Sequence, residues 1–250
     1  MAYRDTILQG RPVQLFMDIY APPETEKSGP VLIWFHAGGF NSGSIQAPGH
    51  RALARWLNGR GMTLIVPQYR INSERQDLSP QIEPRLKELN KHRLEGFRKG
   101  LSGVRSLAAF EDGIAALRWV KKNEKELCIS GQIVMGGSSA GAIIALNIVH
   151  TAHFLGVDVP PVGGVISYSG GYPYPGLYHQ AAVPVFAVHN PNDDRVDINS
   201  IRQLARRDAA VKLIEAPEQE HGSYFLSKGE HKRDAYNRII ERVAHFSGLS

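Results

Sequence analysis

Apolar and polar residues follow two alternating patterns along the chain. Continuous apolar runs, such as VLIWF from Val31 and VFAV from Val185, are typical of strands buried on both faces of a sheet. Between these runs, apolar residues recur every three or four positions, which predicts amphipathic helices. Strands are predicted at 14–22, 31–36, 62–70, 131–137, 163–170, 183–190 and 211–217, and helices at 50–61, 108–126, 140–154, 198–210 and 231–248.

This order of elements predicts one fold class. Strands that alternate with helices form a mostly parallel sheet with helices on both faces. We therefore expect a single α/β domain over residues 1–250, a length that such folds often reach without division. Binding and reacting groups of such a sheet gather in the loops at the carboxyl ends of its strands.

The charge of the chain helps to predict whether it binds nucleic acid. The formal net charge is +5, and Lys and Arg are spread along the chain instead of forming one basic module. The densest basic run, residues 85–105, has apolar residues at roughly helical spacing and predicts an amphipathic helix with a solvated basic face. We therefore expect no nucleic-acid partner.

The amino-terminal residues and the single cysteine help to predict the cellular location of the protein. Residues 1–20 mix charged and apolar side chains, so they predict no signal peptide, and no later run is long enough to span a bilayer. A single cysteine, Cys128, excludes an internal disulfide. We expect a cytoplasmic protein that binds no membrane.

Two adjacent serines, Ser138 and Ser139, lie between a predicted strand and a predicted helix. A serine that attacks a carbonyl must be exposed beside a base and oxyanion donors, and a sharp strand-to-helix turn provides that exposure. Such a turn crowds the backbone, so small residues are needed two positions before and after the nucleophile. Only the register centred on Ser139 places Gly137 and Gly141 there. An ordinary glycine-rich turn and an anion-binding helix start are the alternatives.

Three further loops hold the groups that such a serine needs. The loop HAGGF offers the backbone amides of Gly38 and Gly39, which with the amide of Ala140 form the expected oxyanion hole. Carboxylates follow a strand in the loop HNPNDDRVD, and His221 follows the next strand in the loop EQEHGS. The order Ser, Asp, His, each after a strand, predicts a Ser-His-Asp triad.

The chain resembles the α/β-hydrolases of the esterase and lipase group, which includes hormone-sensitive-lipase-like carboxylesterases and bacterial feruloyl-esterase-like hydrolases. The elbow GGSSAGA and the loop HAGGF carry this resemblance most specifically, and MDIYAP, PQYR and EDGIAALRWVKKN match less specifically. The resemblance implies an eight-stranded, mostly parallel sheet. It also implies Ser139 as nucleophile, His221 as base and Asp193, four residues after His189, as the orienting acid.

The chain departs from the family pattern at three places. Ala37 replaces the first glycine of the oxyanion loop, which is tolerable unless that residue needs a positive φ angle. Ala142 stands where many relatives have a glycine, and we expect it inside the helix. Residues 69–74 read YRINSE, so contacts made by the lid in relatives do not transfer.

These features predict a serine esterase that acts on short-chain carboxylic esters. The connection between the sixth and seventh strands is too short for a large cap, so residues 71–107 are expected to form a small lid, with Tyr172, Tyr174 and Tyr178 covering the site. We expect substrate contacts from Phe40, Ser138 and Tyr172, and neither cofactor nor metal. An arylformamidase-like amide hydrolase and a non-catalytic small-molecule receptor are the alternatives, and a homodimer is left open.

Overall fold

The computed structural model describes residues 1–23, 29–179 and 183–249. Within them lies an eight-stranded sheet whose strands follow the order β1-β2-β4-β3-β5-β6-β7-β8. The first two strands pair antiparallel with each other, and β2 pairs antiparallel with β4, whereas all other neighbours are parallel. The strands are β1 (Ala2–Leu8), β2 (Arg11–Tyr20), β3 (Val31–Phe35), β4 (Thr63–Pro67), β5 (Val134–Ser138), β6 (Gly164–Tyr168), β7 (Val185–His189) and β8 (Val211–Glu215).

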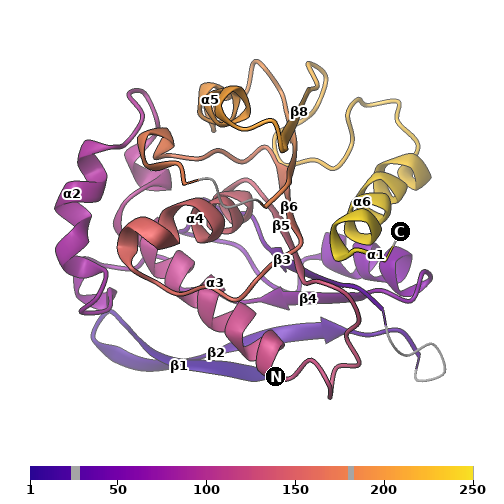
Figure 1. The fold of residues 1–250 in the computed structure, drawn as a ribbon, viewed down its shortest axis with the longest axis horizontal. Coiled ribbons are helices and arrows are strands. Elements are labelled where there is room, and N and C mark those ends of the chain that lie inside the picture. Colours follow the sequence, from indigo (N-terminus) through magenta and orange to yellow (C-terminus); the bar gives the residue numbers. More distant parts are fainter. Residues whose placement is uncertain (24–28, 180–182, 250) are drawn as a thin grey trace.

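Helices cover both faces of this sheet (Figure 1). On one face α3 and α4 pack with α5 against a large apolar core, and on the other α1 and α6 close a second core. All residues of β3 to β7 are buried, as expected for parallel strands covered on both sides. The helices are α1 (Pro48–Asn58), α2 (Leu86–Lys91), α3 (Val104–Lys122), α4 (Ala140–Leu155), α5 (Asn199–Arg207) and α6 (Lys232–Ser247).

The alternation of strands and helices predicted from the sequence is confirmed, including the mostly parallel sheet of eight strands. The predicted strands begin and end within a few residues of the observed ones. The edge strand β1 lies in a segment that mixes charged and apolar residues, and its pattern of burial is irregular. For this reason hydrophobic periodicity did not reveal it.

The predicted helix over residues 85–105 is wrong. Only α2 is helical in this segment before α3 begins, and 3-10 turns at Glu83–Arg85 and Lys99–Leu101 flank it. Gly96 and Gly103 have φ angles of 81° and 80°, which a right-handed helix does not accept. The apolar residues Leu89 and Phe97 are nevertheless buried. The apolar pattern therefore predicted correctly that these residues are buried, but it wrongly predicted one continuous helix.

Residues 71–103 pack over the carboxyl-terminal part of α4 and the loop after β6. The guanidinium of Arg85 donates to the carbonyl of Phe154 at 2.8 Å, and the amide of Leu94 donates to the carbonyl of Pro173 at 2.8 Å. These contacts fix the segment beside the carboxyl edge of the sheet. Among the helices described, none is both long enough and apolar enough to cross a membrane.

Candidate active site

The turn from β5 into α4 is a sharp elbow with Ser139 at its tip. The backbone of Ser139 has φ 54° and ψ −119°, a conformation that L-residues adopt rarely and that clusters at functional sites. A Cβ on Gly137 would lie 2.4 Å from the carbonyl carbon of Gly141, and a Cβ on Gly141 would lie 2.0 Å from the carbonyl oxygen of Phe35. The close approach of these backbones therefore requires glycine on both sides of Ser139.

The three residues predicted as a triad lie within hydrogen-bonding distance of one another. His221 Nε2 is 2.8 Å from Ser139 Oγ, and His221 Nδ1 is 2.6 Å from Asp193 Oδ2. Ser139 follows β5, Asp193 follows β7 and His221 follows β8, so three separate loops at the carboxyl edge of the sheet meet here. In this arrangement Nδ1 carries the proton that Asp193 accepts, and Nε2 faces the serine hydroxyl as an acceptor.

The carboxylate of Asp193 is buried and surrounded by donors. Its Oδ1 accepts hydrogen bonds from the amides of Arg195 at 2.8 Å and Val196 at 3.1 Å, and its Oδ2 lies 3.4 Å from Nε2 of the buried His189. Burial alone raises the pKa of Asp193, but the donors from His189, His221, Val196 and Arg195 outweigh it and hold the pKa well below the usual range. Asp193 is therefore ionised at neutral pH.

The loop after β3 carries the predicted oxyanion donors. Gly38 and Gly39 have φ angles of 134° and 61°, and a Cβ on Gly38 would lie 2.0 Å from the carbonyl oxygen of Ser42. Ala37 is not among the residues with positive φ, which explains why alanine is tolerated there. Ala140 is the first residue of α4, so its amide has no acceptor within the helix.

These groups border one open cleft of about 550 Å³. Ser139 and His221 line it together with Gly38 and Gly39, so the hydroxyl, the imidazole and the glycine loop face the same space. Residues 98–105, the last part of the predicted lid, form another wall. The rest of the segment from 71 lies away from the cleft.

Comparisons with known proteins identify the fold of the chain. A family model described as the α/β-hydrolase fold matches residues 104–185. A solved structure of an esterase from Thermogutta terrifontis, bound to propionate, superposes with a TM-score of 0.66 at 19% identity and covers 98% of this chain and 92% of that chain. The chain has the α/β-hydrolase fold.

Two curated relatives of this chain are named as esterases. Carboxylesterase 5A of Ovis aries is 29% identical over 138 residues, which cover 54% of this chain and 30% of the relative. Fumonisin B1 esterase of Sphingopyxis macrogoltabida is 30% identical over 130 residues, which cover 51% of this chain and 21% of the relative. The match thus spans less than a third of the length of these relatives.

Two of the predicted substrate contacts are wrong. Phe40 and Tyr172 are fully buried and line no part of the cleft. The ring of Phe40 packs 6.1 Å from that of Tyr69, and the Tyr172 hydroxyl lies 3.3 Å from Thr151 Oγ1. Tyr174 is likewise buried, with its hydroxyl accepting from the amide of Gly103. These rings fill the core beneath the lid instead of covering the site.

Ser138 does line the cleft, but its hydroxyl is already engaged. It donates to the carbonyl of Gly222 at 2.8 Å, while the amide of Gly222 donates to Ser169 Oγ at 2.9 Å. Both serines therefore hold the residue that follows His221. The contribution of Ser169 was not foreseen, and its one signal in the sequence is its position directly after β6, at the same edge as Ser139.

The side chain of Asn190 is a second group that sequence reasoning missed. It donates from Nδ2 to the carbonyl of Gln219 at 2.7 Å and so joins the loop of Asp193 to the loop of His221.

Within the described residues no group of three His, Cys, Asp or Glu side chains could hold a metal ion.

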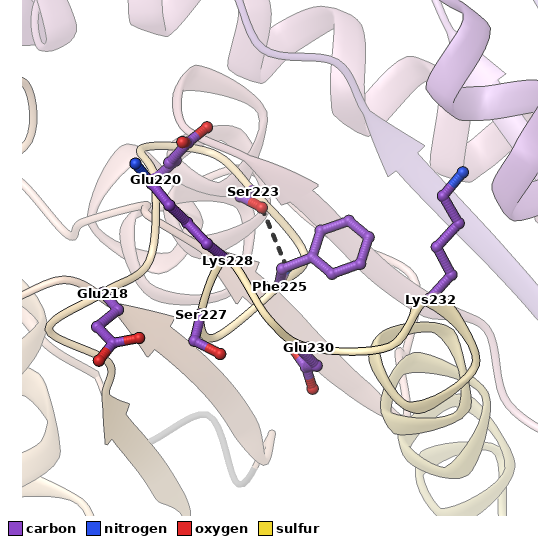
Figure 2. Close-up of a pocket in the computed structure, with 8 residues that line it drawn as sticks. All are labelled: Glu218, Glu220, Ser223, Phe225, Ser227, Lys228, Glu230 and Lys232. Carbon is purple, nitrogen blue, oxygen red and sulfur yellow. Dashed lines mark hydrogen bonds between the residues drawn. The ribbon is translucent and has the colours of Figure 1, made fainter.

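The loop between His221 and α6 borders a separate cavity of about 380 Å³, shown in Figure 2. Glu218, Glu220, Lys228 and Glu230 line it, and the amide of Phe225 donates to Ser223 Oγ at 3.1 Å. None of Ser139, Asp193 and His221 lines this cavity. It is the interior of the loop that carries His221 and holds none of the groups that the triad chemistry needs.

Proposed function

We propose that this protein is a serine carboxylesterase that cleaves short-chain carboxylic esters through an acyl-enzyme. One observation carries the proposal: a continuous hydrogen-bonded chain runs from Ser139 Oγ through both nitrogens of His221 to the carboxylate of Asp193. This is the arrangement that makes a serine hydroxyl nucleophilic. The esterase names of the curated relatives support the same reaction class.

The first half of the proposed reaction acylates Ser139. The hydroxyl oxygen attacks the ester carbonyl carbon while His221 Nε2 takes its proton, and Asp193 stabilises the imidazolium that forms. The carbonyl oxygen becomes an oxyanion that accepts hydrogen bonds from the amides of Gly38, Gly39 and Ala140. The bond to the alcohol oxygen then breaks, and His221 returns the proton to the leaving alkoxide.

The second half hydrolyses the acyl-enzyme. A water molecule gives one proton to His221 Nε2 as its oxygen attacks the acyl carbon, and the same amides hold the second oxyanion. Collapse of this intermediate breaks the bond to Ser139 Oγ, which recovers a proton from His221. A carboxylic acid leaves, and every proton taken by the imidazole has been returned.

The proposed preference for short acyl groups follows from the walls of the cleft. Residues 169–184, which join β6 to β7, are too few to build a helical cap, and the cleft of about 550 Å³ is open to solvent. Propionate is bound in the structurally similar esterase of Thermogutta terrifontis. Methylenes that extend beyond the cleft gain little of the roughly 0.8 kcal/mol that burial of each one confers.

Paired serine variants test the reaction. Ser139→Ala should lower kcat for p-nitrophenyl butyrate by at least about 10⁴-fold, since no nucleophile remains. Ser138→Ala, the matched control, removes one hydrogen bond to Gly222 and should keep most of the activity. Loss of activity in the Ser138 variant with survival in the Ser139 variant would contradict the assignment, and turnover of formanilide without any ester would favour an amide hydrolase.

A chain-length series tests the acyl preference. The value of kcat/KM for p-nitrophenyl esters should peak between acetate and butyrate and fall for decanoate. A maximum at decanoate or longer would show that the cleft holds far more of the chain than its walls suggest.

A further inference from the structure

Three arginine side chains line the cleft that holds Ser139 and His221. Arg98 and Arg105 come from the lid segment, and Arg195 comes from the loop that carries Asp193. All three residues are exposed, so their guanidinium groups are open to a solute in the cleft. Two segments that are far apart in sequence thus bring positive charge to the same space.

Among the residues that the structure describes, no acidic side chain lines this cleft to balance the three arginines. Arg98 donates to the backbone carbonyl of Asp194 at 2.5 Å, a contact that leaves its charge uncompensated and most of its donors unused. In the part of the chain that the structure describes, neither Arg105 nor Arg195 has a carboxylate oxygen within 4.0 Å. The carboxylate of Asp193 is fully buried and bound to His221.

Several arginines elsewhere in the molecule form ion pairs with carboxylates. Arg70 pairs with Asp112 and Glu111, Arg202 pairs with Glu215 at 2.6 Å, and Arg238 pairs with Glu230. Several arginines of the protein are therefore neutralised by carboxylates of the chain. Among the described residues, the three arginines of the cleft have no such ion pair.

We propose that the preferred substrate is an ester that carries a carboxylate group apart from the scissile bond, bound by Arg98, Arg105 and Arg195. This rests on the proposed esterase function and names the class of ester. A guanidinium group is planar and presents paired N–H donors that match the two oxygens of a carboxylate. Positive charge around a cleft also raises the rate at which an anion enters it.

The positive surface extends beyond the cleft. Gly100 and Arg105 also line an adjacent cavity of about 470 Å³, where Arg75, Arg93 and Lys99 add three cations and Glu74 adds one anion. Of these cations, Arg75 is paired with Glu83. A carboxylate that reaches past Arg105 therefore stays in a positive environment. This leaves room for a substrate longer than the reacting ester itself.

Matched pairs of charged and neutral esters test the proposal. In the first pair, para-acetoxybenzoate carries a carboxylate on the alcohol side of the ester, and para-acetoxybenzamide is its neutral partner. In the second pair, monoethyl adipate carries a carboxylate on the acyl side, and the ethyl ester of adipic acid monoamide is its neutral partner. The readout is the ratio of kcat/KM for the charged ester to that for its neutral partner. Both are measured on one preparation, so any loss of folded enzyme cancels, and the ratio of the non-enzymatic hydroxide rates corrects for reactivity.

We expect this ratio to exceed one for at least one pair and to fall with added salt, which screens exposed charges. In Arg98→Gln, Arg105→Gln and Arg195→Gln the ratio should fall, and in the triple variant by roughly tenfold or more, the size expected when charge-assisted hydrogen bonds are lost. Arg60→Gln carries the same charge change at an exposed turn before β4, at the opposite edge of the sheet, and should keep the wild-type ratio.

Two results would overturn the proposal. One is a ratio of one or less for both pairs, and the other is a ratio that the triple variant and Arg60→Gln change equally. Either result leaves the esterase function intact, because the neutral esters are still cleaved. Failure of the esterase function itself is distinguishable, since then no ester in either pair is hydrolysed.

Discussion

At the scale of single residues, the environment of Asp193 decides how the imidazole of His221 is held. Each of its carboxylate oxygens faces donors, and the side chain is fully buried. Its neighbour Asp194 is exposed and takes part through its backbone carbonyl, which accepts from Arg98. Adjacent aspartates therefore differ in what their side chains do.

Substitution of each aspartate by asparagine separates these roles. Asp193→Asn should lower kcat for p-nitrophenyl butyrate by about 10³–10⁴-fold, because an amide favours the wrong tautomer of His221 and does not stabilise the imidazolium. Asp194→Asn keeps its backbone carbonyl and should stay within about threefold of the wild type. Steady-state kinetics at neutral pH measure both, and equal small losses would show that Asp193 does not orient the base.

The placement of Ser139, Asp193 and His221 could be predicted because each follows a strand, and parallel strands end at one edge of the sheet. The contacts of Phe40 and Tyr172 could not be predicted in this way. Phe40 has a φ angle of 65°, which turns its ring into the core beside Tyr69. Which side of a loop a side chain faces depends on such backbone angles, and hydrophobic patterns do not contain them.

At the scale of elements, buried strands were the easiest to predict and the lid the hardest. The strands β3 to β7 form continuous apolar runs because both faces are covered. In the lid, burial of Leu89 and Phe97 follows a helical spacing although the backbone turns repeatedly at glycines. Apolar spacing reports which residues face the core, and it predicts a helix only where no residue requires positive φ.

A buried ion-pair network joins β1, α3 and the segment after β4. Arg70, three residues after the end of β4, binds Asp112 of α3 through its Nε at 3.0 Å and 3.1 Å and through its amide at 2.7 Å. Arg4 of β1 lies 2.5 Å from the same carboxylate. Arg70 is 1% exposed, so its charge depends on these partners instead of on water.

Removal of the central carboxylate should therefore be costly. Asp112→Asn leaves the buried guanidinium of Arg70 with Glu111 as its remaining acidic partner, and we expect a loss of about 3–5 kcal/mol in the free energy of unfolding. Asp158→Asn makes the same charge change at an exposed position and should cost less than about 0.5 kcal/mol. Urea unfolding of both variants measures the difference, and a loss below 1 kcal/mol in Asp112→Asn would refute the role of the network.

At the scale of the whole molecule, buried histidines link folding to pH. Burial lowers the pKa of His36 to about 4 and that of His150 to about 4. In the unfolded chain a histidine has a pKa near 6.5. Between these values the unfolded state binds more protons than the folded state, so stability is fully present above about pH 6.5 and is lost as the pH falls toward 4.

A variant of His150 isolates part of this effect. The imidazole lies among aromatic rings, 5.2 Å from Tyr172 and 5.3 Å from Tyr178, so His150→Phe replaces it with a ring that does not titrate. The slope of the unfolding free energy between about pH 4.5 and 6 should become shallower by roughly 1 kcal/mol per pH unit, because the unfolded state binds most of one extra proton there. Denaturant unfolding across that range gives the slope, and an unchanged slope would mean that His150 is not kept neutral by the fold.

The central claim, that Ser139 is a nucleophile activated by His221, is tested most directly by covalent labelling. A fluorophosphonate forms a stable bond to an activated serine and leaves other hydroxyl groups unmodified. Intact-mass and peptide mass spectrometry of the treated protein should show one adduct, located on Ser139, and neither Ser139→Ala nor His221→Ala should acquire it at a comparable rate. An adduct on Ser138, or a wild-type protein that stays unlabelled while folded, would contradict the account.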